Sequence, residues 1–163
     1  MSVRAELAVE PTLARGLVAV SPAPLLAPRV SPPLAPEHAE GLDLILEGFL
    51  AHHGRPRHLA TTAQSDLVLA GDYCYAAGLV RVARAGDLFV IEALANLIAL
   101  SAGLVADDRR DALPALWAAT VAAIAAPRSP EIAAALDSGH EAALAELAAS
   151  LGDLTDLQEA LAT

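Results

Sequence analysis

The segment VLAGDYCYAAGLVRVARAGD, residues 68–87, decides the fold of this chain. With the residues that precede it, from Thr62 to Ala85, it has the composition of a long helix that is apolar on more than one side. Such a helix is buried among other helices, so we expect it at the centre of the molecule. Gly71 costs a helix interior about 1 kcal/mol relative to alanine, and close packing against another helix is its expected reason. The neighbouring Asp72 would be costly to bury alone, so we expect it to bond to a nearby Arg or Tyr.

Helical signals continue on both sides of this segment. Gly86 and Asp87 form a helix stop followed by an N-cap, and Gly54 and Pro56 end an earlier helix whose apolar residues recur every three or four positions. No segment alternates with the period of two that a strand shows. We therefore predict an all-α, single-domain bundle of about six helices, at residues 37–53, 62–85, 88–105, 111–126, 129–151 and 153–161.

The first 36 residues differ from the rest of the chain. Six prolines fall between Pro22 and Pro36, and proline removes backbone donors and stops helices. We predict that residues 1–36 form a Pro-rich N-terminal arm, either a peripheral strap or a mobile tail, and that residues 37–163 form the helical domain.

The composition points to an interface. Of the 163 residues, 55% are hydrophobic, only 3% are aromatic and 18% are charged, so small aliphatic side chains must build the core. The mean hydropathy of +0.48 leaves apolar surface that an interface would cover. The longest apolar run begins at Leu88 but is interrupted by Glu92 and Asn96, so we expect no transmembrane segment.

Charge and cysteine content exclude further classes. A net charge of −10 disfavours nucleic acid, which needs a basic footprint. All ten basic residues are Arg, so lysine chemistry is absent. Cys74, the one cysteine, is expected to be a small buried hydrophobe in a reducing compartment. Because no signal peptide is recognisable at the start of the sequence, we expect a cytoplasmic protein.

Two polar clusters could carry chemistry. The acidic residues of DDRRD, which are Asp107, Asp108 and Asp111, spell a pattern that binds divalent metal, but they lie between predicted helices, where a solvated turn is the favoured interpretation. The segment AHHGRPRH, residues 51–58, holds three histidines across a Gly-Pro turn without regular ligand spacing. We favour an exposed polar loop there over a weak anion site.

The segment HHGRPRHLATTAQSDLVLAGDYCYAAGLVRVARAGD, residues 52–87, resembles the trans-polyprenyl diphosphate synthases. In that family an RRGxP turn is followed by a helix reading roughly VLxGDYLLAxAxxLLAxxGD. The resemblance covers residues 41–105 and implies a truncated isoprenoid-synthase-like fold. The matching positions, in order, are Gly54, Pro56, Leu69, Gly71, Asp72, Tyr73, Ala77, Gly86 and Asp87.

The departures from the family bear on catalysis. Its first aspartate-rich motif falls on residues 43–47 here, and only Asp43 and Glu47 keep carboxylates, too few for the Mg²⁺ ions that a diphosphate leaving group needs. The second motif should follow residue 151, where Asp153 and Asp156 do not rebuild it. The lysines that grip diphosphate in the family are missing too. The chain is therefore not expected to be catalytic alone, and Mg²⁺ is expected only in a catalytic partner.

The resemblance implies a non-catalytic regulatory small subunit of a heteromeric trans-polyprenyl diphosphate synthase. Such a subunit would stabilise the catalytic large subunit and help to set prenyl chain length. The residues expected at the partner interface are Tyr73, Tyr75, Leu79 and Phe89, with Asp72 as a buried polar anchor.

Two other hypotheses stay open. The first is a homodimeric helical pseudoenzyme or scaffold that binds an apolar, isoprenoid-like ligand in its own cavity. The second is a residual enzyme that uses Asp107, Asp108 and Asp111 with Mg²⁺.

Overall fold

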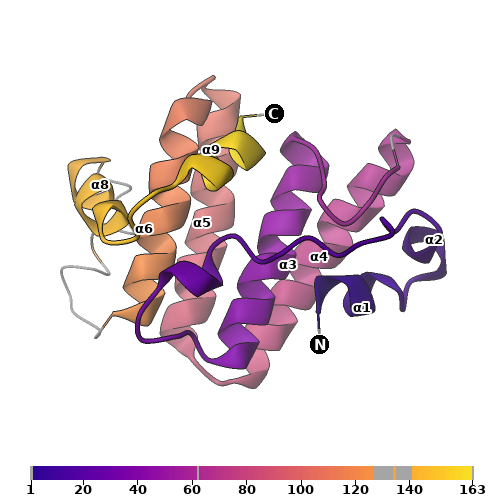
Figure 1. Cartoon of the computed structure of the whole chain (residues 1–163), viewed down its shortest axis with the longest axis horizontal. Helices are drawn as coiled ribbons and strands as arrows, with labels where there is room; N and C mark the ends of the chain where they lie inside the picture. The colour runs from indigo at the N-terminus through magenta and orange to yellow at the C-terminus, as the bar shows by residue number, and fades with distance from the viewer. Residues whose placement is uncertain (1, 62, 127–133, 135–140, 163) are drawn as a thin grey trace.

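The computed structural model describes residues 2–61, 63–126, 134 and 141–162. Over these residues it is an all-α protein without a β-strand, apart from one isolated bridge between Leu17 and Leu59. The predicted fold class is confirmed (Figure 1). The α-helices are α1 (Val3–Leu7), α2 (Pro11–Ala14), α3 (Pro36–His53), α4 (Gln64–Arg84), α5 (Leu88–Ala106), α6 (Leu113–Ala125), α8 (Glu141–Ala149) and α9 (Thr155–Leu161).

The predicted helix ends agree with the structure within two residues from α3 to α6. Asp87 caps α5 by accepting a hydrogen bond from the backbone N–H of Val90 at 3.3 Å, and Gly86 has a φ of 73°, which favours glycine. Asp153 accepts from the N–H of Thr155 at 2.9 Å at the start of α9. The predicted start of a helix at Ser129 lies outside the described residues.

Helices α3 and α4 cross in very close contact at two glycine pairs, Gly41 with Gly78 and Gly48 with Gly71. A Cβ added to Gly78 would lie 2.8 Å from the carbonyl oxygen of Gly41, and one added to Gly48 would lie 3.0 Å from the carbonyl oxygen of Gly71. The expected close packing at Gly71 is therefore confirmed. The residues 68–87 hold α4 against α3 because they place glycine where the backbones meet.

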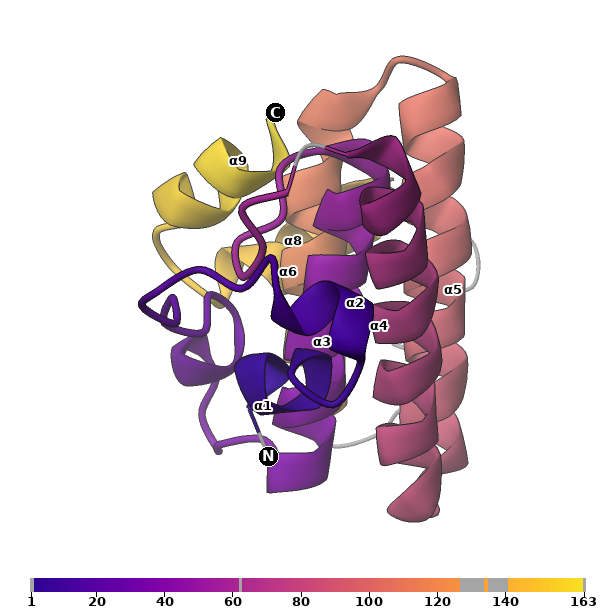
Figure 2. The same ribbon diagram turned by 90° about the vertical axis from the view of Figure 1, so that its right-hand side faces the viewer.

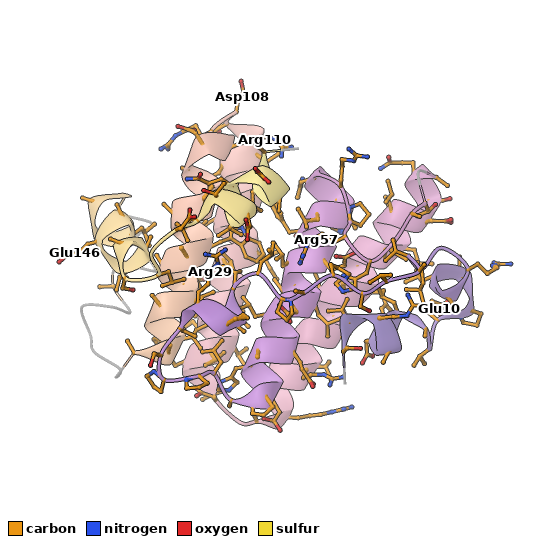
Figure 3. All side chains as sticks on the ribbon, in the orientation of Figure 1. Glu10, Arg29, Arg57, Asp108, Arg110 and Glu146 are labelled. Atoms are coloured by element: carbon orange, nitrogen blue, oxygen red, sulfur yellow. The ribbon has the colours of Figure 1, made fainter. Side chains whose placement is uncertain are left out.

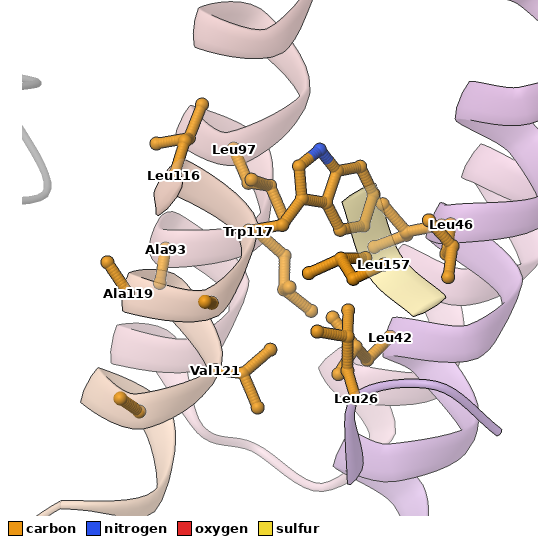
Figure 4. Packing of buried hydrophobic residues seen from close by; sticks show 14 of the residues in the cluster. Leu26, Leu42, Leu46, Ala93, Leu97, Leu116, Trp117, Ala119, Val121 and Leu157 are labelled. Carbon is orange, nitrogen blue, oxygen red and sulfur yellow. The ribbon is translucent and has the colours of Figure 1, made fainter. Parts of the chain in front are cut away.

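The larger core lies where α3, α5, α6 and α9 meet. Trp117 of α6, labelled in Figure 4, is fully buried. Its ring centroid lies 5.5 Å from that of Phe49 of α3. Leu157 of α9 and Leu26 of the N-terminal arm belong to the same cluster. Alanines of α6 complete it, which fits the low aromatic content of the sequence.

The N-terminal arm packs on the domain and contains α1 and α2, two short helices beyond the six that the sequence predicted. Leu7 and Leu13 are buried in a second, smaller core with Cys74 of α4. The backbone N–H of Val18 donates to the carbonyl of His58 at 2.9 Å, and that of Ala60 donates to Gly16 at 2.8 Å. Residues 2–36 thus lie as a strap across α3 and α4 (Figure 1).

Candidate functional site

Asp43 and Glu47 lie on one face of α3, one turn apart. Glu47 is only 1% exposed. Its Oε1 accepts the backbone N–H of His58 at 2.7 Å, and its Oε2 accepts that of Arg57 at 3.1 Å. The Nδ1 of His58 lies a further 2.9 Å from Oε2. Because a buried carboxylate needs such donors, Glu47 holds the turn after α3 against the helix.

Asp43 lies next to Glu47 beside a small, partly polar cavity of about 110 Å³. Burial raises the pKa of Asp43 to about 6, while the positive charges of Arg57 and His58 act in the opposite direction and Glu40 adds to the rise. The N-terminal arm closes the cavity with Ser2, Val3 and residues 21–24.

Arg57 lines the cavity and also bonds to the N-terminal arm that covers it. Its Nη2 donates to the carbonyl of Ala23 at 2.8 Å (Figure 3). The arm therefore covers the cavity beside Asp43 and Glu47. Over the described residues no group of three or more His, Cys, Asp or Glu side chains could hold a metal ion.

The histidine segment is not the exposed polar loop that the sequence favoured. His58 is buried because Glu47, eleven positions earlier in the chain, supplies its partner. His53 is half-buried, and burial, followed by the charges of His52 and Arg110, lowers its pKa. The carbonyl of His53 also accepts a hydrogen bond from the Nη2 of Arg110 at 2.8 Å, which ties this segment to the start of α6.

Asp72 has a different partner and a different environment from those expected. Its side chain is 72% exposed, and its Oδ1 lies 3.2 Å from the Nε2 of His52 rather than bonding to an Arg or Tyr. Within this chain it is thus a surface residue. The His52 ring in turn lies beside that of Tyr75, with centroids 5.4 Å apart.

The other residues expected at a partner interface are divided between the two cores. Tyr75, Leu79 and Phe89 are half-buried against the larger core. Tyr73 packs against the smaller one, and its hydroxyl donates to the Oε1 of Glu6 at 3.2 Å. The contact between Tyr73 and the arm could not be read from a helical period, because it joins residues far apart in the chain.

Other side chains, which were not expected at an interface, form an exposed apolar surface. On α4 these are Val68, Leu69 and Val80, and at the start of α5 Leu88 is 77% exposed. Val68 and Leu69 are neighbours, and Val80 follows Leu69 by eleven residues, about three helical turns, so the sequence could have placed them on one side of α4. The expected position of this helix at the centre of the molecule was wrong, because only five residues of α4 are buried. A helix that is apolar on more than one side gives no indication of which side faces solvent.

The DDRRD segment forms the predicted surface turn. Asp107, Asp108 and Asp111 are all exposed. Asp108 has a φ of 58° and points away from the molecule at the end of α5 (Figure 3). The short 3-10 turn Arg110–Ala112 then leads into α6.

Comparisons of the chain with protein-family models, with curated proteins and with solved structures found no match.

Proposed function

We propose that this chain is a non-catalytic regulatory small subunit of a heteromeric trans-polyprenyl diphosphate synthase. One observation carries the proposal: both carboxylate oxygens of Glu47 already accept hydrogen bonds from the turn at Arg57 and His58. A metal ion could bind Glu47 only by displacing these donors from a buried position. The arm over Asp43 adds a second obstacle to a diphosphate.

An exposed face of α4 and α5 supports docking on a partner. The two helices lie side by side (Figure 2). Only 28% of the most apolar 18-residue stretch of α5 is buried. We define the α4–α5 face as the exposed residues Val68, Leu69, Asp72, Ala76, Val80, Leu88, Glu92, Ala95 and Ala99. Exposed apolar surface of this kind marks interaction sites.

The same helix α5 is, among the described residues, the one long and apolar enough to cross a membrane by length and composition. Helices in protein cores pass that test as well, so it is weak evidence for a span. Docking of α5 against another helical protein accounts for the same apolar surface.

The charges on the α4–α5 face favour a different chain as the partner. Asp72 and Glu92 are the charged residues among these nine, and both are acidic, whereas the exposed Arg84 lies one turn of α4 beyond Val80. Two copies of the face would bring like charges together, whereas a partner with an Arg or Lys at this place would pair with them. A catalytic subunit with such a face is the partner we propose.

Co-expression with a full-length polyprenyl synthase from the same genome tests this function. We expect a complex in size-exclusion chromatography with light scattering, and a change in the activity or product length of the synthase. Val80→Glu places a charge in the α4–α5 face at a residue that is 50% exposed, and should abolish the complex. Val20→Glu, at a residue that is 80% exposed in the arm, is the matched control and should leave the complex intact.

The opposite results have defined meanings. A stable homodimer that ignores every synthase offered would contradict the regulatory function and favour a homodimeric scaffold. Complex formation that Val80→Glu leaves unchanged would contradict the assigned docking face.

A further inference from the structure

A groove of about 290 Å³ lies between α5, α6 and α8, and none of the residues that line it lines the cavity beside Asp43. It exists because α8 packs chiefly against α6 and not against α5. Figure 1 shows α6 between α8 and α5. Leu100 and Leu104 of α5 form one wall, and Leu144 and Ala145 of α8 form the other.

Small residues leave the groove open. Its floor is Ala112, Ala115 and Leu116, at the start of α6. Leu116 and Leu144 are buried and continue into the larger core, whereas Ala115 is half-exposed and Ala145 is exposed. A larger side chain at either alanine would fill the space that the helices leave.

The lining of the groove also includes polar residues. Arg109 and Asp111 are the only charged residues among the described residues that line it, and they have opposite signs. A ligand head group that is itself charged would be attracted to one of them and repelled by the other. A hydroxyl can accept from the guanidinium and donate to the carboxylate, so an uncharged head group fits best.

We propose that this groove binds an aliphatic chain of medium length with a neutral hydroxyl head group. The aliphatic walls would take the chain, and Arg109 and Asp111 would take the hydroxyl. The volume is at the lower end of the range of roughly 300–1,000 Å³ that small-molecule pockets span. This site does not depend on the proposed function, because it shares no residue with the α4–α5 face or with the cavity beside Asp43.

Binding of 1-decanol and of geraniol to the full chain, measured by isothermal titration calorimetry, tests the proposal. The two probes have the same number of carbon atoms, and comparing them distinguishes linear chains from branched isoprenoid ones. We expect saturable binding of at least one probe. Absence of saturable binding for both would overturn the proposal.

Two variants of α8 locate the binding site. Ala145→Leu fills the groove and should weaken binding by about tenfold or more, equivalent to about 1.4 kcal/mol. Ala149→Leu, at an exposed position on the same helix that does not line the groove, should bind as the unmodified protein does. Equal binding by the two variants would overturn the assigned site.

A third variant keeps the test valid if Ala145→Leu fails to fold. Leu104→Ala shortens a half-buried wall residue and enlarges the groove, so it should shift the preference from 1-decanol towards 1-dodecanol by several-fold. An unchanged preference in this variant would contradict the proposed position of the chain.

Discussion

The imidazole of His52 lies where a Cβ on Gly71 would have to be. The added atom would be 2.3 Å from the Nε2 of His52, far below contact distance. A second glycine of α4, Gly78, is blocked differently, because its neighbour is the carbonyl oxygen of Gly41 in the backbone of α3. Both glycines let α3 and α4 lie close together. A side chain at position 71 would meet the movable side chain of His52, whereas one at position 78 would meet the backbone of α3.

Three glycine-to-alanine variants should therefore differ in their free energy of unfolding. Gly78→Ala should lower the free energy of unfolding by about 1–3 kcal/mol, because two backbones must move apart. Gly71→Ala should cost less, since the His52 side chain can rotate and alanine adds about 1 kcal/mol of helix propensity. Gly103→Ala, with open space around its Cα, should raise stability by about 0.5–1 kcal/mol. Urea unfolding followed by circular dichroism measures all three, and a Gly78→Ala variant as stable as Gly103→Ala would contradict the crossing.

Glu47→Gln should destabilise the protein by about 2–3 kcal/mol, because a buried backbone donor at the turn loses its acceptor and meets an amide N–H instead. Glu92→Gln, at an exposed position of α5, is the control and should change stability by less than about 0.5 kcal/mol. Thermal and urea unfolding of both variants give the comparison. Similar stability for the two would mean that the Glu47 hydrogen bonds contribute little.

Asp43→Asn should stabilise the protein at neutral pH. The pKa of Asp43 is raised to about 6 from the ordinary 3.8, mainly by burial, so the folded chain binds this proton more tightly than the unfolded chain does. The carboxylate therefore lowers stability progressively as the pH rises through the window between these two values. We expect a gain of about 1–2 kcal/mol at pH 7.5, less than the full pKa shift implies because the group is partly exposed.

The gain from Asp43→Asn should fall to a small part of its neutral-pH value at pH 4, where Asp43 is almost fully protonated in the folded chain and still partly ionised in the unfolded chain. Urea titrations of the two proteins between pH 4 and pH 8 measure the difference. A difference that does not depend on pH would contradict the raised pKa.

Cys74 should react with thiol reagents only when the protein unfolds. Burial raises the pKa of its thiol, with the charges of Glu47 and Glu6 adding to the rise, and the side chain is fully buried between α4 and the arm. At pH 8 we expect the rate of reaction with dithionitrobenzoate to follow the unfolding equilibrium as urea is added. Rapid reaction of the native protein would show that the arm opens locally.

Leu26→Ala should destabilise the protein as much as a substitution in the helical core, by about 2–5 kcal/mol. Leu26 is completely buried although it lies in the Pro-rich arm. Val20→Ala, at an exposed position in the same arm, should have little effect. Equal, small effects of both substitutions in thermal unfolding would show that the arm is dispensable for stability.

The helices could be predicted because their signals are local. The Gly86–Asp87 pair and the apolar period of α3 act within one or two turns, and the structure has helix ends within two residues of those positions. The burial of Leu7, Leu13 and Leu26 depends on partners far along the chain, and prolines around Leu26 indicate only its local conformation. For the same reason the sequence could not show that Glu47 is the partner of His58.

The strap also joins the two ends of the described chain. Leu26 lies close to Leu157 of α9 (Figure 4) and belongs to the same cluster as Leu157 and Leu161. The guanidinium of Arg29 lies 3.3 Å from the carboxylate of Asp156 and donates to the carbonyl of Asp153. During synthesis, residues near the start must therefore wait for α9 to leave the ribosome before their burial is complete. A chain interrupted before α9 would leave Leu26 and the surface of α6 exposed together.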